Sequence, residues 1–263
     1  MATVEMRFYE ELNDFLPADR RKTAFKHTFH GRVSVKDLVE SLGVPHTEID
    51  LILVNGHSVG FSYLVQDGDH ISVYPVFESL DISPVLRLRP KPLRVTRFVA
   101  DIHLGKLARH LRMLGFDTLY RNDYQDDELA RISSSQGRIL LTHDCGLLKR
   151  NEVTHGYWIR SNRPVEQLKE IVRRFDLAGS TSPFSRCLKC NGALSAVAKA
   201  QVIARLEEET RRIFNKFRIC QSCGRIYWPG SHYQRMQNLI DRLFSREEKA
   251  ISSNPTDSEI LSK

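Results

Sequence analysis

Four cysteines in two short pairs are the residues of this sequence with the clearest chemistry. Cys187 and Cys190 form one Cys-x-x-Cys pair, and Cys220 and Cys223 form the other. A glycine follows the second cysteine of each pair, directly or after one residue, as expected where backbone amides fold beneath a thiolate. Two intervening residues let both sulfurs reach one tetrahedral ion, and a closed four-thiolate site is structural. We therefore predict one structural zinc ion bound by all four side chains.

The spacing of the pairs also constrains their surroundings. They are separated by 29 residues, more than the roughly 15–20 of common four-cysteine sites. We expect residues 197–217 of this insert to form helix. Metal binding in a reducing compartment suits this cysteine usage better than a disulfide framework does. Cys145, the fifth cysteine, is interpreted either as a buried core residue or as a neighbour of a second site.

Aspartates that end two predicted strands form that second candidate site. Asp101 closes an apolar strand at 97–101, and Asp144 closes another at 138–144. In a parallel α/β sheet, ligands gather beyond the carboxyl ends of neighbouring strands. Several carboxylates there repel one another unless a cation lies among them, and their hard oxygens suit Mg²⁺ or Mn²⁺. The same layout also suits a phosphoacceptor receiver domain or a phosphatase.

A third carboxylate is expected after a strand at 117–121. Asp123 is one candidate, and Asp126 together with Asp127 is the other. Each has a structural alternative, because Asp123 suits a turn and Asp126 suits the N-terminus of a helix. The two strand-ending aspartates could likewise cap the helices that follow them.

Strands and helices alternate from residue 95 onwards, which favours a parallel sheet. The helix expected at 103–114 carries its leucines on one face. Its basic side chains Lys106, Arg109 and Arg112 are candidate contacts to a phosphate backbone or, alternatively, form its solvated face. A further strand is expected at 156–160, and further helices at 126–133 and 164–175.

The first 80 residues follow a different pattern. Ser34 and Asp37 form a capping box at the start of a helix expected at 34–43, and Asn55-Gly56 signals a tight turn. The order β-β-α-β-β is that of a small β-grasp domain. The strands are expected at 4–10, 23–29, 51–54 and 70–77.

The overall prediction is a multidomain protein of mixed α/β and α+β class. We expect a β-grasp domain at 1–82, a basic proline-rich linker at 83–94, a parallel α/β domain at 95–178, a zinc ribbon at 179–245 and a disordered tail at 246–263.

Charge is spread unevenly over a chain of net charge +7. Residues 1–84 hold 7 Lys or Arg against 13 Asp or Glu, whereas the remainder holds 32 against 19. Such asymmetry suggests that the later part meets a polyanion such as nucleic acid. No apolar run approaches the roughly 18 residues of a membrane span. The N-terminus lacks the basic and apolar regions of a secretory signal, so we expect a cytoplasmic protein.

Several stretches resemble a known family. FVADIHLGKLARHLRMLGFDTLY, DDELARI and GRILLTHDCGLL are similar to the PIN-like RNase family named for the C-terminal domain of the exonuclease Mut-seven. RCLKCNGAL and FRICQSCGRIYWPGSHYQRM resemble the zinc ribbon that ends that family's domain. LILVNG and FSYLVQDGD resemble the ubiquitin-like, sulfur-carrier-like domain often fused in front. The sulfur carriers end in a free Gly-Gly, which is missing here, so we expect a binding or positioning module instead of a carrier, with a protein partner as one possible ligand.

The resemblance implies a metal-dependent RNase with acidic ligands. Asp101 matches the acid of the first strand and Asp144 that of the third. Asp126 is the best match for the middle acid, with Asp127 as the neighbour that could replace it. The sequence departs from the family pattern around Asp144, where His143 and Cys145 stand in place of basic residues.

We therefore predict hydrolysis of RNA phosphodiester bonds with Mg²⁺ or Mn²⁺ held by Asp101, Asp126 and Asp144. In the ribbon, Tyr227, Trp228 and Tyr233 could stack on unpaired bases, or pack its small core. The alternative function is a non-catalytic RNA-binding or adaptor protein with a structural zinc ribbon. A receiver-like phosphoacceptor is disfavoured, because the later strand end offers arginines instead of a lysine.

Overall fold

The computed structural model describes residues 1–75, 88 and 96–251, with only the backbone described for 246–251. The predicted linker at 83–94 therefore lies outside the described residues, apart from Leu88. Leu88 belongs to the hydrophobic core of the N-terminal domain and is 9% exposed.

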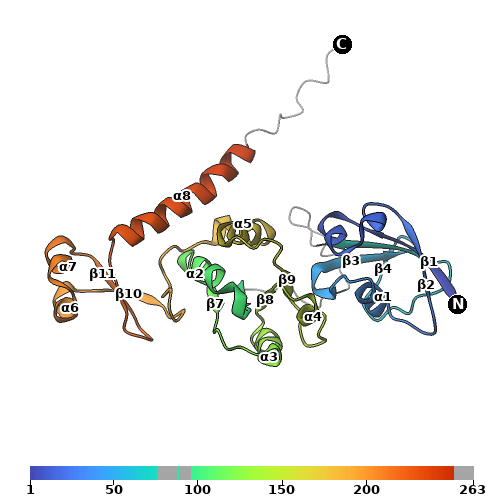
Figure 1. Ribbon diagram of the computed structural model, residues 1–263, viewed down its shortest axis with the longest axis horizontal. Coiled ribbons are helices and arrows are strands. Elements are labelled where there is room, and N and C mark those ends of the chain that lie inside the picture. The colour runs from blue at the N-terminus through green and yellow to red at the C-terminus, as the bar shows by residue number, and fades with distance from the viewer. Residues whose placement is uncertain (76–87, 89–95, 252–263) are drawn as a thin grey trace, which may run out of the picture. The chain divides into compact units, whose positions relative to one another are not determined.

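The N-terminal residues form a β-grasp domain around one five-stranded sheet (Figure 1). The sheet order is β2-β1-β5-β3-β4, in which β1 and β5 are parallel and the other neighbours antiparallel. Its elements are β1 (Ala2–Phe8), η1 (Glu10–Phe15), η2 (Ala18–Arg20), β2 (Phe25–Phe29), α1 (Val35–Ser41), η3 (His46–Glu48), β3 (Ile49–Val54), β4 (His57–Ser58) and β5 (His70–Pro75).

Local sequence signals set the ends of these elements. Ser34 is the N-cap of α1, and its hydroxyl accepts a hydrogen bond from the backbone N–H of Asp37, as a capping box requires. Asn55 and Gly56 both have positive φ, at 50° and 80°, which a two-residue hairpin turn between β3 and β4 needs. The predicted helix and turn are therefore confirmed.

The following α/β domain has a four-stranded sheet of order β7-β6-β8-β9. β6 is parallel to β8, and β8 is parallel to β9, as the alternation of strands and helices predicts. The domain comprises β6 (Arg97–Ala100), η4 (Ile102–Leu104), α2 (Gly105–Met113), β7 (Asp117–Leu119), α3 (Asp126–Gln136), β8 (Ile139–Thr142), α4 (Cys145–Leu148), β9 (Gly156–Trp158) and α5 (Pro164–Arg174).

A hydrophobic cluster fixes one side of this sheet. Val99 and Leu140 from the adjacent strands β6 and β8 are fully buried with Leu129 of α3 and Leu148 of α4. Because consecutive strand residues point to opposite faces, Leu141 lies on the other face, and it is also fully buried. Both faces of these central strands are covered, as expected for a parallel sheet.

The cysteine region forms a small three-stranded antiparallel sheet of order β10-β11-β12. Within the predicted helical stretch 197–217, residues 199–205 and 208–213 are helical, whereas 197 and 217 belong to strands. Val202 and Leu206 from this stretch form a core with Phe217. The elements of the region are η5 (Ala178–Ser180), β10 (Leu194–Val197), α6 (Lys199–Val202), η6 (Ile203–Arg205), α7 (Glu208–Ile213), β11 (Phe217–Cys220), β12 (Ile226–Tyr227) and α8 (Ser231–Ile251).

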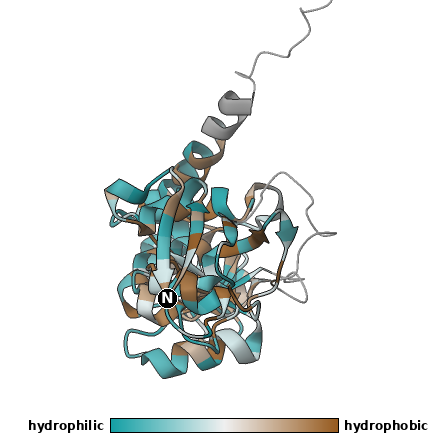
Figure 2. Ribbon diagram, turned by 90° about the vertical axis from the view of Figure 1, so that its right-hand side faces the viewer, coloured by the Kyte–Doolittle hydropathy of each residue, from teal (hydrophilic) through white to brown (hydrophobic). Residues whose placement is uncertain are grey.

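The last helix corrects one prediction. The tail was expected to be disordered from residue 246, but α8 continues to Ile251, and only 252–263 lie outside the described residues. Figure 2 shows hydrophobic and hydrophilic residues alternating along α8. Ile240 and Leu243, which precede the predicted tail, are 6% and 5% exposed, so buried apolar side chains stabilise the part of α8 from which the helix continues to Ile251.

The chain divides into two compact units, and the division differs from the predicted domain boundaries. One unit contains residues 1–108 and 118–167, and the other contains 109–117 and 168–263. Within the second unit, Ser182 and Phe184 donate backbone hydrogen bonds to Leu114 and Met113, so the end of α2 is bound to the segment before the ribbon. In the described residues, no helix has the length and apolar character needed to cross a membrane.

Candidate functional site

The four paired cysteines lie together. The sulfurs of Cys187, Cys190, Cys220 and Cys223 are all within 4.8 Å of one another. Among the residues that the structure describes, no other group of three or more His, Cys, Asp or Glu side chains brings its ligand atoms so close. This cluster can hold a metal ion, and with the three-stranded sheet it is consistent with a zinc ribbon.

The sulfur separations fit a tetrahedral ion. The Sγ atoms of Cys187 and Cys223 are 3.7 Å apart, and those of Cys190 and Cys220 are 3.4 Å apart. In a tetrahedral site with Zn–S bonds of roughly 2.3 Å, neighbouring sulfurs lie roughly 3.8 Å apart. A disulfide would bring two sulfurs to about 2.05 Å, so these distances fit four ligands of one ion and do not fit disulfide bonds.

The two cysteine pairs fold alike. The backbone N–H of Asn191 donates to the carbonyl of Cys187, and that of Gly224 donates to the carbonyl of Cys220. The residue directly after each pair takes the left-handed conformation, with φ of 70° at Asn191 and 67° at Gly224. In the first pair, Gly192 was expected to provide this turn, but Asn191 takes the left-handed conformation instead. Gly192 has another role, because a Cβ at this position would lie only 2.9 Å from the Cys220 sulfur.

Tyr227 is part of this site through its hydroxyl group. The hydroxyl accepts from the backbone N–H of Leu188 at 3.1 Å and lies 3.1 Å from the Cys187 sulfur, to which it donates. Burial raises the pKa of the Cys187 thiol, but the hydrogen bonds from Tyr227 and nearby backbone groups outweigh it and lower that pKa to about 6. Tyr227 therefore favours the thiolate form of Cys187, a role that its side-chain type alone did not reveal.

Asp101 and Asp144 stand at the ends of adjacent parallel strands. In the register of β6 and β8, Ala100 is paired with Leu141, so Asp101 follows β6 directly and Asp144 lies two residues beyond the end of β8. Asp101 is buried, at 9% exposure, and Asp144 is exposed. Two neighbouring strands therefore carry these aspartates.

Thr142 joins the two aspartates. Its side chain is completely buried, and its hydroxyl donates to Oδ2 of Asp101 at 2.6 Å and accepts from the backbone N–H of Asp144 at 2.9 Å. Asp144 also caps α4, since its Oδ1 accepts from the N–H of Gly146 at 2.7 Å. Asp101 precedes η4 without making a side-chain cap. Sequence reasoning missed Thr142, although a polar residue at the end of an apolar strand was a visible signal.

The candidates for the middle acid differ in their partners. Asp123 accepts two hydrogen bonds from Arg121, at 2.9 and 2.8 Å, and these bonds lower the pKa of its carboxyl group. Asp127 forms an ion pair with Arg150. Asp126 is exposed and is the first residue of α3, whose N-cap is Gln125, so the alternative that Asp126 is the N-cap is wrong.

The three predicted carboxylates are not assembled into one tight cluster. The ligand atoms of Asp101, Asp126 and Asp144 do not all lie within 4.8 Å of one another in the described structure. β7 ends at Leu119, earlier than predicted, so a stretch of six residues separates the strand from Asp126. The donor chemistry of the Asp101–Asp144 pair suits a hard cation, with one oxygen of each carboxylate engaged in the hydrogen bonds described above.

The three basic residues of α2 have different environments. Lys106 and Arg109 are exposed, as a contact to a phosphate backbone requires. Arg112 is 3% exposed, and its Nη1 donates to the carbonyls of Leu188 and Lys189 in the first cysteine pair, at 3.2 and 3.0 Å. The prediction that Arg112 contacts substrate is therefore corrected, because its guanidinium group supports the cysteine site.

The residues that flank Asp144 are held by structural contacts. Nδ1 of His143 donates to the carbonyl of Ile159 at 2.7 Å, which fixes the ring. Cys145 is partly buried, and burial raises the pKa of its thiol, so it is neutral and a poor nucleophile. Cys145 is thus a neighbour of the Asp101–Asp144 pair and has no evident chemical part in it.

The aromatic residues of the ribbon do not share one role. Trp228 is 39% exposed and is absent from the ribbon core of Val202, Leu206 and Phe217. Tyr233 packs against Phe184, with ring centroids 4.3 Å apart. Of the three aromatic residues predicted to stack on bases, Trp228 is therefore the exposed one.

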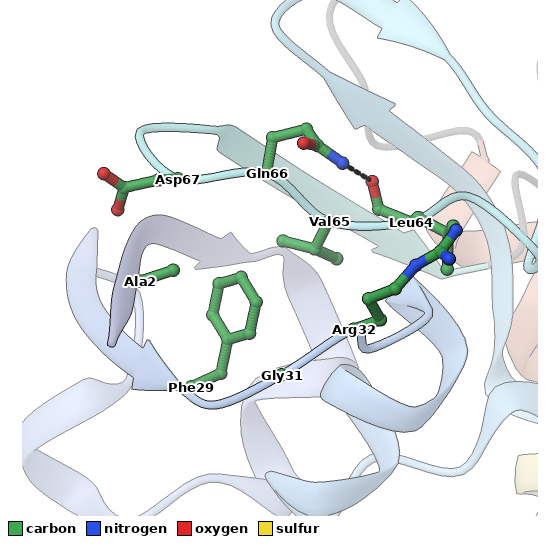
Figure 3. A pocket seen from close by; sticks show the side chains of 8 residues that line it. All are labelled: Ala2, Phe29, Gly31, Arg32, Leu64, Val65, Gln66 and Asp67. Carbon is green, nitrogen blue, oxygen red and sulfur yellow. Dashed lines mark hydrogen bonds between the residues drawn. The ribbon is translucent and has the colours of Figure 1, made fainter.

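A separate hollow of about 370 Å³ lies in the β-grasp domain (Figure 3). Phe29 and Val65 form its apolar floor, and Arg32 and Asp67 contribute its charges; Ala2, Gly31, Leu64 and Gln66 complete its lining. Oδ1 of Asp67 already accepts from the backbone N–H of Thr3 at 2.7 Å. The lining holds one carboxylate and no cysteine or histidine, so this hollow is not a candidate catalytic or metal site.

Comparison with known proteins adds to this geometry. Residues 96–240 match the family model described as the Mut7-C RNase domain, and residues 1–81 match the model described as Mut7-C ubiquitin. Two solved structures also match, crystal structures of small archaeal modifier protein 1 from Haloferax volcanii. They are 18% and 17% identical to the chain over 29% and 30% of its length and 100% of their own, each with a TM-score of 0.24. No curated protein matches the chain.

The family model of the RNase domain covers more than half of the chain, and it includes both the Asp101–Asp144 pair and the four cysteines. The chain therefore belongs to the Mut7-C RNase domain family, with the ubiquitin-like domain of that family in front of it.

Proposed function

We propose that the protein is a metal-dependent ribonuclease that hydrolyses RNA phosphodiester bonds at Asp101 and Asp144, with Asp126 as the third carboxylate. The observation that carries this proposal is the pairing of Asp101 and Asp144 at adjacent strand ends, joined through the Thr142 hydroxyl at 2.6 and 2.9 Å. Membership of an RNase-domain family supports the choice of RNA as substrate.

Each residue of the site has a distinct part. Asp101, buried and held by Thr142, would be the fixed ligand of Mg²⁺ or Mn²⁺, and the exposed Asp144 would share the ion. Asp126 is exposed and would join when the substrate is bound, because contacts in an active site often tighten only in the complex with substrate. A divalent ion, when bound, would activate water and offset the charge that develops on the phosphate. Lys106 and Arg109 would hold the RNA backbone.

Activity assays with matched variants test this proposal. The purified protein is incubated with single-stranded and structured RNAs in Mn²⁺ or in EDTA, beside Asp101→Asn and Asp144→Asn. Asp19→Asn is the control, because Asp19 is exposed and lies in another domain. We expect cleavage that needs Mn²⁺ and both aspartates, and that is unchanged in the control.

Two other outcomes would contradict the proposal. Cleavage that survives Asp101→Asn and Asp144→Asn would place the chemistry elsewhere. Tight RNA binding without cleavage, in protein with its ribbon intact, would favour the alternative of an RNA-binding adaptor.

We also propose that the four cysteines bind one structural zinc ion. The sulfur separations of 3.4 and 3.7 Å and the thiolate donor set support zinc. One zinc per chain in the purified protein is the expected result, with a ribbon that unfolds when a strong chelator removes the metal. A metal-free protein whose ribbon remains folded would contradict it.

A further inference from the structure

The β-grasp domain and the α/β domain touch through a small set of buried polar groups on η3. Oε1 of Glu48 accepts a hydrogen bond from the backbone N–H of Trp158 at 2.6 Å, and the Glu48 side chain is completely buried. Nε2 of His46 lies 2.9 Å from the carbonyl oxygen of Val153, to which it donates. Both residues belong to the first compact unit of the chain, together with their partners.

Further contacts surround this pair of bonds. Nζ of Lys149 donates to the carbonyl of Glu40 at 2.9 Å. The rings of Phe15 and Trp158 have centroids 5.0 Å apart. The contact therefore includes an aromatic pair as well as hydrogen bonds, and it reaches the segment from the end of α4 to β9.

Arg160 balances the buried charge of Glu48. Its Nη2 lies 3.9 Å from Oε2 of Glu48, and its Nε donates to Oδ2 of Asp14 at 2.8 Å. Burying a carboxylate is costly unless it is paired and hydrogen-bonded. A domain that was merely tethered beside its neighbour would leave such a group in water, so the burial of Glu48 points to a specific contact.

The contact falls on the edge of the α/β sheet. β9 is the last strand in the order β7-β6-β8-β9, and it pairs with β8 on one side only. A backbone N–H at a buried sheet edge needs an acceptor, which a further strand would normally provide. Glu48 provides it for Trp158 in place of that strand.

Trp158 continues this connection to the residues before Asp144. Its indole Nε1 donates to the carbonyl of His143 at 3.0 Å. The next residue, Ile159, accepts from Nδ1 of His143 and donates its own N–H to the carbonyl of Thr142 at 2.8 Å. The carbonyls of Thr142 and His143, the two residues before Asp144, are thus bound to the strand end that Glu48 holds.

We propose that Glu48 is a positioning residue for the catalytic loop: the ubiquitin-like domain acts in cis, through Trp158 and His143, to hold Asp144 beside Asp101. This inference rests on the proposed function, since it assumes that Asp144 binds the divalent ion. It assigns the β-grasp domain a role inside the nuclease, in addition to any protein partner.

The test uses the full-length protein with Glu48→Met, which keeps the length of the side chain and removes the carboxylate that accepts from the Trp158 N–H. Glu10→Met is the matched control, because Glu10 is an exposed glutamate of the same domain. Amide hydrogen exchange of residues 143–148 and the fluorescence of Trp158, in a Trp228→Phe background, report on the loop without requiring activity. The Mn²⁺ dependence of RNA cleavage reports on the site.

We expect Glu48→Met to speed exchange at 143–148. It should also raise the Mn²⁺ concentration for half-maximal cleavage by roughly 10- to 100-fold, the range for groups that orient metal ligands. The KM for RNA should stay unchanged, and excess Mn²⁺ should restore the rate. The control should behave as the wild type in all measurements.

Several results would overturn the inference. Wild-type exchange at 143–148 in Glu48→Met would show that the contact does not hold the loop. Faster exchange with an unchanged Mn²⁺ dependence would show that the contact is structural only.

If the wild-type protein does not cleave RNA at all, the proposed function fails, and the exchange data still decide whether Glu48 holds the loop in place. Should Glu48→Met not fold, Trp158→Phe removes the indole bond to His143 and must give the same changes in exchange.

Discussion

Replacing Thr142 by valine tests how the two aspartates are held together. Valine has nearly the shape of threonine, but it lacks the hydroxyl that donates to Asp101 Oδ2 at 2.6 Å and accepts from the Asp144 N–H at 2.9 Å. Because Thr142 is fully buried, water cannot replace that hydroxyl without rearrangement. The variant therefore leaves a carboxylate without its donor and a backbone N–H without its acceptor.

The size of the effect follows from these two bonds. A hydrogen bond to a charged group contributes about 1.5–3 kcal/mol, and one between neutral groups contributes about 0.5–1.5 kcal/mol. Asp101 is slightly exposed, at 9%, and can recover part of its loss from solvent. We therefore expect Thr142→Val to lower the free energy of unfolding by about 2–4 kcal/mol.

The measurement is urea unfolding of the wild type, Thr142→Val and Thr142→Ser, with the stability taken from the midpoints at a common slope. Thr142→Ser keeps the hydroxyl and loses one buried methyl group, which costs about 1 kcal/mol. RNA cleavage should decrease more in the valine variant than in the serine variant. A valine variant that is as stable and as active as the serine variant would refute the proposed bridging role of the hydroxyl.

Three further predictions concern other parts of the chain. Tyr227→Phe removes the hydroxyl that donates to the Cys187 thiolate. The metal affinity should become roughly 10- to 100-fold weaker, so a chelator should extract zinc more readily. Unchanged zinc release would contradict the role of the hydroxyl. Trp228→Ala should weaken binding of single-stranded RNA by about 1–3 kcal/mol, whereas Trp228→Tyr should keep most of it; anisotropy titrations in which both variants match the wild type would exclude stacking. Burial and the hydrogen bond to Asp69 raise the pKa of Tyr63 above its usual value. The neutral phenol of Tyr63 therefore stabilises the folded state below about pH 10, and this stabilisation is lost as the pH rises through the folded-state pKa. Between about pH 9 and about pH 11, the wild type should lose more free energy of unfolding than Tyr63→Phe. Equal losses in the two proteins would contradict this prediction.

The secondary structure was largely predictable because its signals are local. The Ser34 capping box, the Asn55-Gly56 turn and the two cysteine pairs each specify their structure within a few residues. The strands and helices of the α/β domain follow from hydrophobic periodicity in the same way. Their ends were less certain, and β7, which stops at Leu119, is the clearest example.

The contacts that position the site were not predictable, because they join residues far apart in the chain. Arg112 has the pattern of a basic residue on an exposed helix face, yet it is buried against carbonyls that follow it by 76 and 77 residues. Glu48 resembled an ordinary acidic residue in a short turn, and only the folded chain brings it to Trp158. Thr142 depends on the register of β8 against β6, which a single sequence does not specify.

The central claim is that a divalent ion shared by Asp101 and Asp144 contacts the phosphate that is cleaved. It is tested most directly with an RNA in which sulfur replaces one non-bridging oxygen of that phosphate, in each of the two stereoisomers. Sulfur is a poor ligand for Mg²⁺ and a better one for Mn²⁺. We predict that one stereoisomer is cleaved slowly in Mg²⁺ and that Mn²⁺ restores its cleavage. Equal rates for both stereoisomers and the unmodified RNA in Mg²⁺ would contradict the claim.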